Sequence, residues 1–484
     1  LSISGRIYDD SNGDGVKGAD ETGLEGWEVT LLKPDGGSVA QQSDRNGYYI
    51  FSGLLPGSYK VVANAQENWT AASPETGTKD VELVDVHESE IDFGFMSERI
   101  ENIPSIIAVT FNKTFGGPYQ DNFNSVQPAP DGGYILAGYT SPEYVDGYFR
   151  GHAWLLKADS EGDELWNKTF GTGGDVYSVQ ITNESDYILA CESTDPEALL
   201  IKTDSEGNEV WNKTFPADGN SEESSRLTSI QLTPDNGFIL AGWSTRRWQN
   251  SIHWLFKIDP EGNKIWTKTF DDEPFTNLLV LPTPDDGYIL AGDIVGPEDT
   301  AFGGVTLIKI GSEGNEVWKK TLLGLRSHLN SIQLAPDDGY ILAGYLESFW
   351  QEDREAWLLK VDAEGNELLN KTFGAGPYSI SEFTSAQITS NGDCILAGSL
   401  STSNDNYWEV YINRDNLSDA WLLKVDSEGN EIWNKTFGGS NYDSASSVQL
   451  TPDGGYIVAG ATQSFGVGMA DAWLFKVDSE GNIV

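Results

Sequence analysis

The sequence predicts an all-β protein in two parts, a small β-sandwich followed by a ring of repeated four-stranded sheets. Three observations support this fold class. The 484-residue chain contains 53 glycines and 19 prolines, which separate short stretches of alternating apolar and polar residues. Little of the chain shows the 3.6-residue period of an amphipathic helix. A unit with the pattern of four strands recurs along most of the sequence.

The composition disfavours two classes of partner. Asp and Glu number 75 against 30 Lys and Arg, which gives a formal net charge of −45. Nucleic acids and anionic membrane surfaces attract clustered Lys and Arg, whereas the longest run here is Arg246–Arg247. We expect no nucleic acid as a partner and no direct membrane insertion, because no apolar run has the length of a membrane span. The start at Leu1 favours a processed or excerpted soluble piece of a larger protein.

The repeated unit defines the second part, residues 108–484. Its segment YILAG, or a close variant, occurs seven times at intervals of 50 to 62 residues, and a segment like AWLLKVDSEGNEIWNKTFGG follows each copy. Each period predicts four strands of the types SVQLT, YILAG, AWLLKV and EIWNKTF, joined by PDGG and DSEGN turns. Seven such units predict a seven-bladed β-propeller, because radial repetition protects the edges of the sheets.

The ring is expected to close through a strand near its beginning. The last unit stops at Val484 before its fourth strand, whereas VTFNKTFGG at 109–117 matches EIWNKTFGG at 431–439. We expect this N-terminal strand to complete the seventh blade of the same chain. The alternative is donation of the strand to a neighbouring molecule, which would build a filament by the same strand addition.

Residues 1–98 lack the repeat and predict a separate domain, joined to the propeller by a linker at 99–107. In GYYIFSGLLPGSY, at 47–59, Tyr49 and Phe51 have the spacing of a buried strand face that leads through a Pro-Gly turn into the next strand. Further alternating runs predict a small antiparallel β-sandwich of the Ig-like or prealbumin-like type.

The same stretch resembles the B-type domains of serine-aspartate repeat surface adhesins, relatives of the collagen-adhesin B repeat. The residues that carry this resemblance are Gly47, Tyr49, Phe51, Leu54, Pro56, Gly57 and Tyr59. The propeller is similar to the tandem-repeat propellers of large secreted surface proteins, notably those of methanogenic archaea. Both resemblances imply a secreted or cell-surface location, and neither implies a catalytic site.

A structural calcium site is predicted after the first strand. The segment DSNGDGVKGADE fits the spacing D-x-N-x-D-G-x5-E, which places oxygen ligands at alternating positions and a bidentate carboxylate at the end. The alternative is an acidic surface turn, because the long helices of an EF-hand are lacking. The expected Ca²⁺ ligands are Asp10, Asn12, Asp14, the carbonyl of Val16, and Glu21.

Eight N-x-[ST] sequons predict a glycoprotein. Five of them are the NKT of the fourth strand, where a glycan would meet solvent. The alternative is that NKT is simply a good edge-strand sequence, whose Lys discourages pairing between sheets. The sequon asparagines are Asn68, Asn112, Asn167, Asn183, Asn212, Asn370, Asn416 and Asn434.

Recognition is expected on the propeller face that carries the variable loops. The loops between second and third strands, and between blades, vary in length, whereas the hairpin turns are nearly constant. Exposed aromatic residues in these loops suit stacking on sugars or anchoring a protein partner, unless they pack onto their own loops. The candidates are Tyr144, Tyr148, Trp248, Trp350, Tyr407 and Trp408.

Other recurrent residues are interpreted as structural. The Asp and Asn of the DSEGN turns are expected to bond their own backbone rather than a metal. Cys191 and Cys394 are expected to be small buried apolar residues. Glutamines of the inner strands predict a hydrogen-bonded ladder around the axis. These are Gln127, Gln180, Gln231, Gln333, Gln387 and Gln449.

Catalysis has little support, because the four histidines are dispersed and no nucleophile or metalloprotease motif accompanies them. We therefore expect a non-enzymatic structural protein of the cell surface, an envelope or extracellular-filament component that contacts other copies of itself or surface proteins and glycans. The alternative is a carbohydrate- or protein-binding adhesive propeller. A propeller glycosidase, which would need two carboxylates in a deep pocket, is the third hypothesis.

Overall fold

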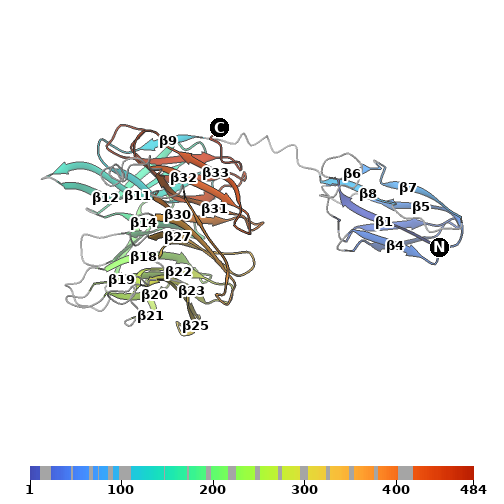
Figure 1. Ribbon diagram of the computed structural model, residues 1–484, viewed down its shortest axis with the longest axis horizontal. Helices are drawn as coiled ribbons and strands as arrows, with labels where there is room; N and C mark the ends of the chain where they lie inside the picture. Colours follow the sequence, from blue (N-terminus) through green and yellow to red (C-terminus); the bar gives the residue numbers. More distant parts are fainter. Residues whose placement is uncertain are drawn as a thin grey trace. The chain divides into compact units, whose positions relative to one another are not determined.

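Figure 1 shows the computed structural model of the protein. It describes residues 1–10, 23–24, 26–44, 47–64, 69–74, 76–84, 91–97, 111–145, 148–171, 174–191, 198–215, 225–245, 251–270, 275–294, 304–322, 327–347, 354–374, 380–401 and 418–483. The chain divides into two compact units, Leu1–Ile107 and Ala108–Val484, called here the N-terminal unit and the repeat unit. In the described ranges no helix is long and apolar enough to cross a membrane.

The N-terminal unit contains two four-stranded sheets, with strand orders β4-β1-β8-β6 and β3-β2-β5-β7. Strands β1 and β8 are parallel, and the other neighbours are antiparallel. The strands are β1 (Ser2–Asp9), β2 (Glu28–Leu32), β3 (Ser38–Gln42), β4 (Tyr48–Ser52), β5 (Gly57–Ala63), β6 (Trp69–Ser73), β7 (Thr78–Leu83) and β8 (Phe93–Ser97).

Alternating apolar residues from both sheets form the core of the N-terminal unit. Val29 and Leu31 of β2 are fully buried in one cluster with Ile3 of β1, which belongs to the other sheet. Tyr49 and Phe51 of β4 are 3% and 5% exposed, so the buried face predicted for this strand is confirmed. Because successive side chains of a strand point to opposite faces, every second side chain lies between the two sheets. Short strands can therefore form the core of a sandwich.

The repeat unit is built from four-stranded antiparallel sheets whose strands mostly follow one another along the chain. The first strands are β10 (Asp121–Pro128), β14 (Val176–Ile181), β18 (Ser225–Leu232), β22 (Phe275–Pro282), β26 (Ser327–Leu334), β30 (Ile380–Ile388) and β34 (Asp443–Leu450). The second strands are β11 (Tyr134–Val145), β15 (Tyr187–Cys191), β19 (Phe238–Ser244), β23 (Tyr288–Ile294), β27 (Tyr340–Glu347), β31 (Cys394–Ser401) and β35 (Tyr456–Thr462).

The third and fourth strands complete each sheet. The third strands are β12 (Tyr148–Ala158), β16 (Ala198–Thr203), β20 (Ile252–Ile258), β24 (Gly304–Ile310), β28 (Arg354–Val361), β32 (Ser418–Val425) and β36 (Asp471–Val477). The fourth strands are β13 (Glu164–Phe170), β17 (Glu209–Phe215), β21 (Lys264–Phe270), β25 (Glu316–Leu322), β29 (Glu367–Phe373), β33 (Glu431–Phe437) and β9 (Asn112–Phe115), which pairs with β36.

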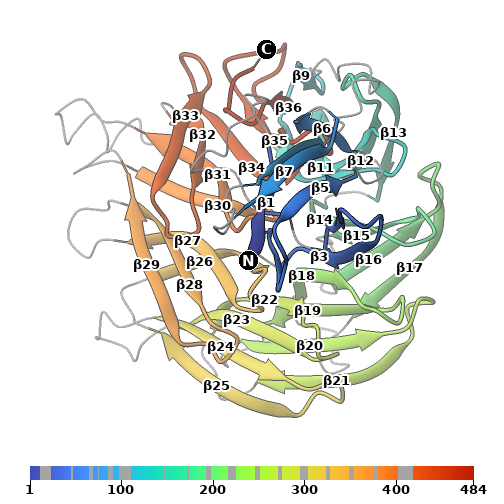
Figure 2. The same ribbon diagram turned by 90° about the vertical axis from the view of Figure 1, so that its right-hand side faces the viewer.

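Figure 2 shows these sheets arranged around a common centre, with the fourth strands outermost. Second strands are packed on both faces by neighbouring sheets, and β15 is accordingly buried at every position. Fourth strands alternate between exposed and half-buried positions, as in β13, because they lie at the edge of each sheet. A parallel contact between Arg354 and Ile380 also joins the β26–β29 and β30–β33 sheets. The strand types predicted from the repeat are confirmed.

Two short turns lie at the same end of each sheet, one after the first strand and one after the third. We call them the first turn and the second turn. In the first turn of the β22–β25 sheet, the Thr283 N–H donates a hydrogen bond of 3.0 Å to the Gly287 carbonyl, and Asp286 has a φ of 61°. In the second turn Gly314 has a φ of 82°. These are three-residue hairpin loops that end on a left-handed residue.

Candidate functional site

The turn end of six of the seven described sheets of the repeat unit carries an ion pair. Lys257 of β20 donates to both carboxylate oxygens of Asp235 in the first turn of the same sheet, at 2.8 Å. It also donates to the Thr233 hydroxyl at 3.0 Å, and its side chain is only 6% exposed. Similar pairs are Lys157–Asp131, Lys202–Asp186, Lys309–Asp285, Lys360–Asp337 and Lys476–Asp453.

Sequence analysis missed these lysines, although their signal was present. A lysine recurs in otherwise apolar third strands, and a buried ammonium requires a carboxylate partner. Burial alone would raise the pKa of Asp285, but hydrogen bonds from Lys309 and Thr283 outweigh it and lower this pKa to about 2. Each ion pair thus links the first turn to the third strand of the same sheet.

Neighbouring sheets meet at the same end through a contact that we call a seam. Trp266 of β21 lies against Gly314 in the second turn of the next sheet, where an added Cβ would approach the indole to 3.3 Å. The indole Nε1 donates to the Ser312 carbonyl, and Lys268 donates to the Gly314 carbonyl, both at 3.1 Å. Equivalent contacts are Trp166–Gly207, Trp211–Gly262, Trp318–Gly365, Leu369–Gly429 and Trp433–Gly481.

The fourth strand β9 makes the same kind of contact with the β10–β13 sheet, and we call this contact the closing seam. Phe111 takes the place of the tryptophan and lies against Gly162, where a Cβ would come within 2.5 Å of its ring. Lys113 donates to the Asp163 carboxylate at 2.6 Å, where four other seams have a lysine that donates to an asparagine. The closing seam therefore contains an ion pair in place of a neutral hydrogen bond.

Serine hydroxyls link neighbouring first strands near the centre. Ser125 accepts a hydrogen bond from the Val179 N–H at 3.2 Å, and Ser447 accepts one from the Val126 N–H at 3.3 Å. The second bond joins the last sheet of the sequence to the β10–β13 sheet. The first strands also line a cavity of about 370 Å³ with amide and hydroxyl groups.

The glutamines predicted to form a ladder line this central cavity. Among the described residues, no hydrogen bond joins two of these glutamine side chains. The lateral bonds run through the serines two positions earlier, because a short hydroxyl reaches the neighbouring backbone while the longer amide extends into the cavity. The predicted glutamine ladder is therefore wrong, and Leu281 of β22 interrupts the glutamine series.

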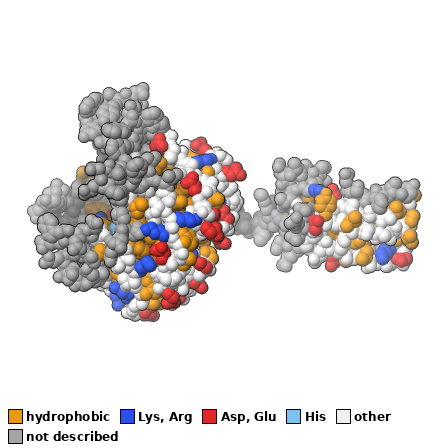
Figure 3. Space-filling model, turned by 60° about the horizontal axis from the view of Figure 1, so that its bottom comes forward, with side chains coloured by type: hydrophobic (Ala, Val, Ile, Leu, Met, Phe, Trp, Pro, Cys, Tyr) orange, Lys and Arg blue, Asp and Glu red, His pale blue; other side chains and the backbone are white. Residues whose placement is uncertain are grey.

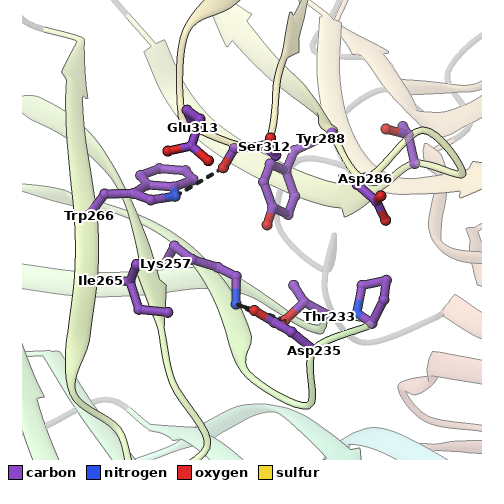
Figure 4. A pocket seen from close by; sticks show the side chains of 12 residues that line it. Thr233, Asp235, Lys257, Ile265, Trp266, Asp286, Tyr288, Ser312 and Glu313 are labelled. Carbon is purple, nitrogen blue, oxygen red and sulfur yellow. Dashed lines mark hydrogen bonds and ion pairs between the residues drawn. The ribbon is translucent and has the colours of Figure 1, made fainter.

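Figure 4 shows a second cavity, of about 460 Å³, at the seam between the β18–β21 and β22–β25 sheets. Trp266 and Tyr288 form its aromatic part, with ring centroids 5.9 Å apart and planes at 66°. The Lys257–Asp235 pair lies on the opposite side, and Asp286 contributes a carboxylate. The cavity is thus formed by the two turns, whose sequences vary little between sheets.

Tyr288 is the most unusual group of this cavity. It is 5% exposed, and its hydroxyl makes no hydrogen bond to a described residue. Burial raises its pKa to about 12, and the carboxylates of Asp235, Asp286 and Glu313 act in the same direction. Figure 4 shows the hydroxyl pointing into the cavity, toward the side of Lys257 and Asp235. The phenol is therefore neutral and available to an occupant of the cavity.

The predicted calcium ligands are described only in part. Asp10 follows β1, is fully buried, and donates its N–H to the Phe95 carbonyl at 3.0 Å. A buried carboxylate at the first position of the loop fits a hard cation such as Ca²⁺. The calcium site stays a prediction, because four of its expected ligands lie outside the described residues: Asn12, Asp14, Val16 and Glu21.

The aromatic residues predicted to lie in variable loops are largely outside the description. Tyr144 and Tyr148 belong to β11 and β12, which continue as a hairpin in which Tyr144 is opposite Phe149. The loop predicted at these two positions is wrong, because the strands keep pairing beyond the end of the sheet. Their side chains lie outside the description, as do the whole residues Trp248, Trp350, Tyr407 and Trp408.

The NKT segments combine exposure with two fixed contacts. Asn434 is exposed, and its Oδ1 accepts a hydrogen bond from the Trp421 Nε1 at 2.7 Å. Lys435 donates to Asn482 of the next sheet at 2.8 Å, so the lysine joins two sheets of the same chain. The other sequon asparagines described are exposed: Asn112, Asn167, Asn183, Asn212 and Asn370. Asn68 and Asn416 lie outside the described residues.

Other structural interpretations are confirmed. The carboxylate of Asp426 accepts hydrogen bonds from the N–H groups of Glu428 and Asn430 at 2.9 and 2.8 Å, so this DSEGN turn bonds its own backbone. Cys191 and Cys394 are both buried.

The N-terminal 98 residues match the SdrD B-like domain, which confirms the resemblance for this segment. The serine-aspartate repeat-containing protein F of Staphylococcus epidermidis is 28% identical over 105 residues, covering 19% of this chain and 6% of that protein. A fibrinogen-binding protein of the same species is 31% identical over 91 residues, covering 19% and 8%. The chain thus spans less than a tenth of the length of either relative.

Two solved structures illustrate the similarity over the longer part of the chain. The WD40 domain of Neurospora crassa Pan2 covers 78% of this chain and 97% of its own, with 9% identity and a TM-score of 0.46. PorZ, a surface component of the type-IX secretion system of Porphyromonas gingivalis, covers 95% and 61%, with 10% identity and a TM-score of 0.42. At this level of similarity neither supports a conclusion about function.

Proposed function

We propose that this chain is a non-enzymatic protein of the cell surface, in which a B-like sandwich precedes a propeller. The match of residues 1–98 to the SdrD B-like domain carries the proposal. The fibrinogen-binding protein that shares this similarity is named for an adhesive activity. The exposed sequons and the net charge of −45 agree with a glycosylated, strongly hydrated surface protein.

Within this proposal the N-terminal unit is a stiff spacer that holds calcium. Asp10 would provide the first ligand from the end of β1, and the loop that follows would provide the others. Calcium would tie this loop to the core, because Asp10 is itself fully buried. Affinity in the range of extracellular modules, about 10⁻⁴ to 10⁻³ M, would suffice at the cell surface.

We infer that the repeat unit is a seven-bladed propeller closed by β9 of the same chain. The pairing of β9 with β36, the closing seam and the Ser447–Val126 hydrogen bond support closure within one molecule. Only residues 116–120 separate β9 from β10. Because five residues span less than about 20 Å, donation of β9 to another molecule would pull β10 out of its own ring.

Two roles are compatible with a surface propeller, and one observation favours the second. The first is structural, as an envelope or filament component assembled from copies of the chain. The second is adhesive, with the propeller presenting a ligand site. The cavity favours the adhesive role, because exposed carboxylates and aromatic rings line it and the Tyr288 hydroxyl points into it.

Light scattering of the full chain, with calcium and with a chelator, tests this proposal. We expect a monomer in both conditions, and chelation should lower the melting temperature of the N-terminal unit. A polymer that disappears when residues 109–115 are deleted would overturn closure within one chain and favour the structural role. Antibody labelling of intact source cells tests the location, and labelling only after lysis would contradict it.

A further inference from the structure

The cavity at the seam between the β18–β21 and β22–β25 sheets has an excess of negative charge. Lys257 and Asp235 neutralise each other at 2.8 Å. Asp286 and Glu313 also line the cavity, and within the described part of the chain neither forms an ion pair. Both residues are exposed, so they surround the mouth rather than the floor. Two carboxylates are therefore left for a ligand from outside.

The interior of the cavity is aromatic. Tyr288 is 5% exposed, and its unpaired hydroxyl points into the cavity. Trp266 is half-buried beside it, and Ile265 is 55% exposed at the edge. Aromatic faces attract organic cations, and an apolar edge accommodates the aliphatic stem of a long cationic side chain.

We propose that this cavity receives a lysine or arginine side chain from a basic segment of a partner protein. The stem would lie along Ile265 and Trp266, and the charged group would lie between the Asp286 and Glu313 carboxylates. The Tyr288 hydroxyl would accept a hydrogen bond from it. This inference rests on the proposed adhesive role and names the chemistry of the partner. A strongly acidic chain also attracts basic partners over a distance, which raises the rate of association.

Two other ligand classes fit the cavity less well. Calcium takes six to eight oxygen ligands, and the residues of this cavity combine two unpaired carboxylates with aromatic rings. A neutral sugar can stack on Trp266, but it gains nothing from the net charge of the mouth. On the face that Figure 3 draws, Asp and Glu are dispersed among Lys and Arg, so the test must separate binding at this cavity from attraction by the general negative charge.

The equivalent turns of other sheets in the same chain allow a comparison with this cavity. In the described first turns, only Asp286 and Asp338 place a carboxylate at the left-handed position, which Asp occupies less readily than Gly. Asp338 precedes the buried Tyr340, so the next seam repeats this carboxylate and this tyrosine. In the first turn of the β18–β21 sheet, Asn236 and Phe238 stand at these positions. We therefore expect two cation sites, at adjacent seams.

Titration calorimetry of the full chain with an acetylated, amidated pentalysine peptide tests the proposal at about 0.15 M salt. Asp286→Asn combined with Glu313→Gln should reduce the stoichiometry from two to one. The matched control is Glu206→Gln combined with Glu261→Gln, which removes the same charge from the second turns of other seams. This control should leave both sites. Tyr288→Phe, which copies Phe238, should weaken the first site about threefold without unfolding the seam.

Equal losses in the test pair and in the control pair would overturn the proposal, because binding would then follow net charge alone. Displacement of the peptide by glucose, or by calcium but not by sodium at equal ionic strength, would assign the cavity to a sugar or a metal instead. Thermal melting of each variant confirms that it is folded. Failure of peptide binding would contradict the cation site but not the proposed cell-surface location. Labelling only after cell lysis would contradict the location but not the cation site.

Discussion

The ordinary seams and the closing seam make the same kind of packing contact between sheets, but with different residues. At an ordinary seam a tryptophan covers a glycine of the next sheet and a lysine donates to a neutral group, as Lys435 does to Asn482 at 2.8 Å. At the closing seam Phe111 covers Gly162, and Lys113 pairs with the Asp163 carboxylate at 2.6 Å. The indole hydrogen bond is lost and a charge is gained.

The comparison shows that β9 packs with the ordinary geometry of a fourth strand. The rings of Phe111 and Tyr134 lie 5.9 Å apart at 62°, close to the 5.9 Å and 66° of Trp266 and Tyr288. β9 therefore lies beside the third strand β36 in the position of a fourth strand. What distinguishes it is its chemistry, an ion pair where the chain lacks a tryptophan.

Deleting residues 109–115 is the strongest way to break this comparison. It removes β9, exposes the edge of β36, and empties the space of Phe111, which is 7% exposed. Loss of a buried aromatic side chain alone costs roughly 3–5 kcal/mol. We expect the repeat unit to melt at a much lower temperature in calorimetry, while the N-terminal unit is unchanged. An unchanged transition of the repeat unit would show that β9 is not part of the closed structure.

Acid is expected to lower the stability of the repeat unit more than that of the N-terminal unit. In the repeat unit, hydrogen bonds from Lys309 and Thr283 outweigh the effect of burial and lower the pKa of Asp285 to about 2, and the pKa of Asp235 is lowered in the same way. The ion pair described in the N-terminal unit, Lys60–Asp80, is exposed. A lowered carboxylate pKa stabilises the fold above the unfolded value of about 3.9.

The stabilisation of the repeat unit should therefore be lost as the pH falls from about 4 to about 2. Thermal melting at pH about 4 and at pH about 2 should show a larger loss for the transition of the repeat unit than for that of the N-terminal unit. Lys309→Met should reduce this pH dependence, because Asp285 then titrates near its ordinary value. Parallel shifts of both transitions would contradict the assignment to the buried lysines.

One sheet provides a natural test of the lysine pairs. Lys257 pairs with Asp235, whereas the first turn beside Lys424 has Asn391 at the equivalent position, and Lys424 forms no ion pair with a described residue. Lys257→Met should cost about 1–3 kcal/mol, because it strips donors from a carboxylate and a hydroxyl. Lys424→Met should cost less. Urea denaturation measures both, and equal losses would mean that packing of the lysine stem outweighs the ion pair.

Much of the fold could be predicted from the sequence, because its signals are local. The run Tyr288–Gly292 is apolar throughout, which predicts a strand covered on both faces, and it is buried at every position. The alternation at Tyr49 and Phe51 likewise predicts a half-buried strand. Turn positions follow from Gly, Asp and Asn, whose backbone preferences do not depend on distant residues.

The contacts between sheets could not be predicted, because they depend on how far one sheet is displaced along its neighbour. The spacing of NKT shows that Lys435 shares a face with Trp433, but not that Asn482 lies opposite it. The cavity at Tyr288 has the same cause, since it is formed by turns about 50 residues apart in sequence. Sequence analysis therefore favoured the variable loops and overlooked the nearly constant turns.

The smallest expected effect lies at the closing seam itself. Asp163→Asn converts its ion pair into the neutral Lys–Asn hydrogen bond of the ordinary seams. The two side chains are 35% and 66% exposed, so the change should be below about 1 kcal/mol and should shrink further at high salt. The reverse change, Asn366→Asp beside Lys320, places a carboxylate at an ordinary seam where the present hydrogen bond is 2.6 Å. Urea denaturation at low and high salt should show opposite signs for the two variants, and a salt-independent loss in Asp163→Asn would mean that the carboxylate acts through geometry rather than charge.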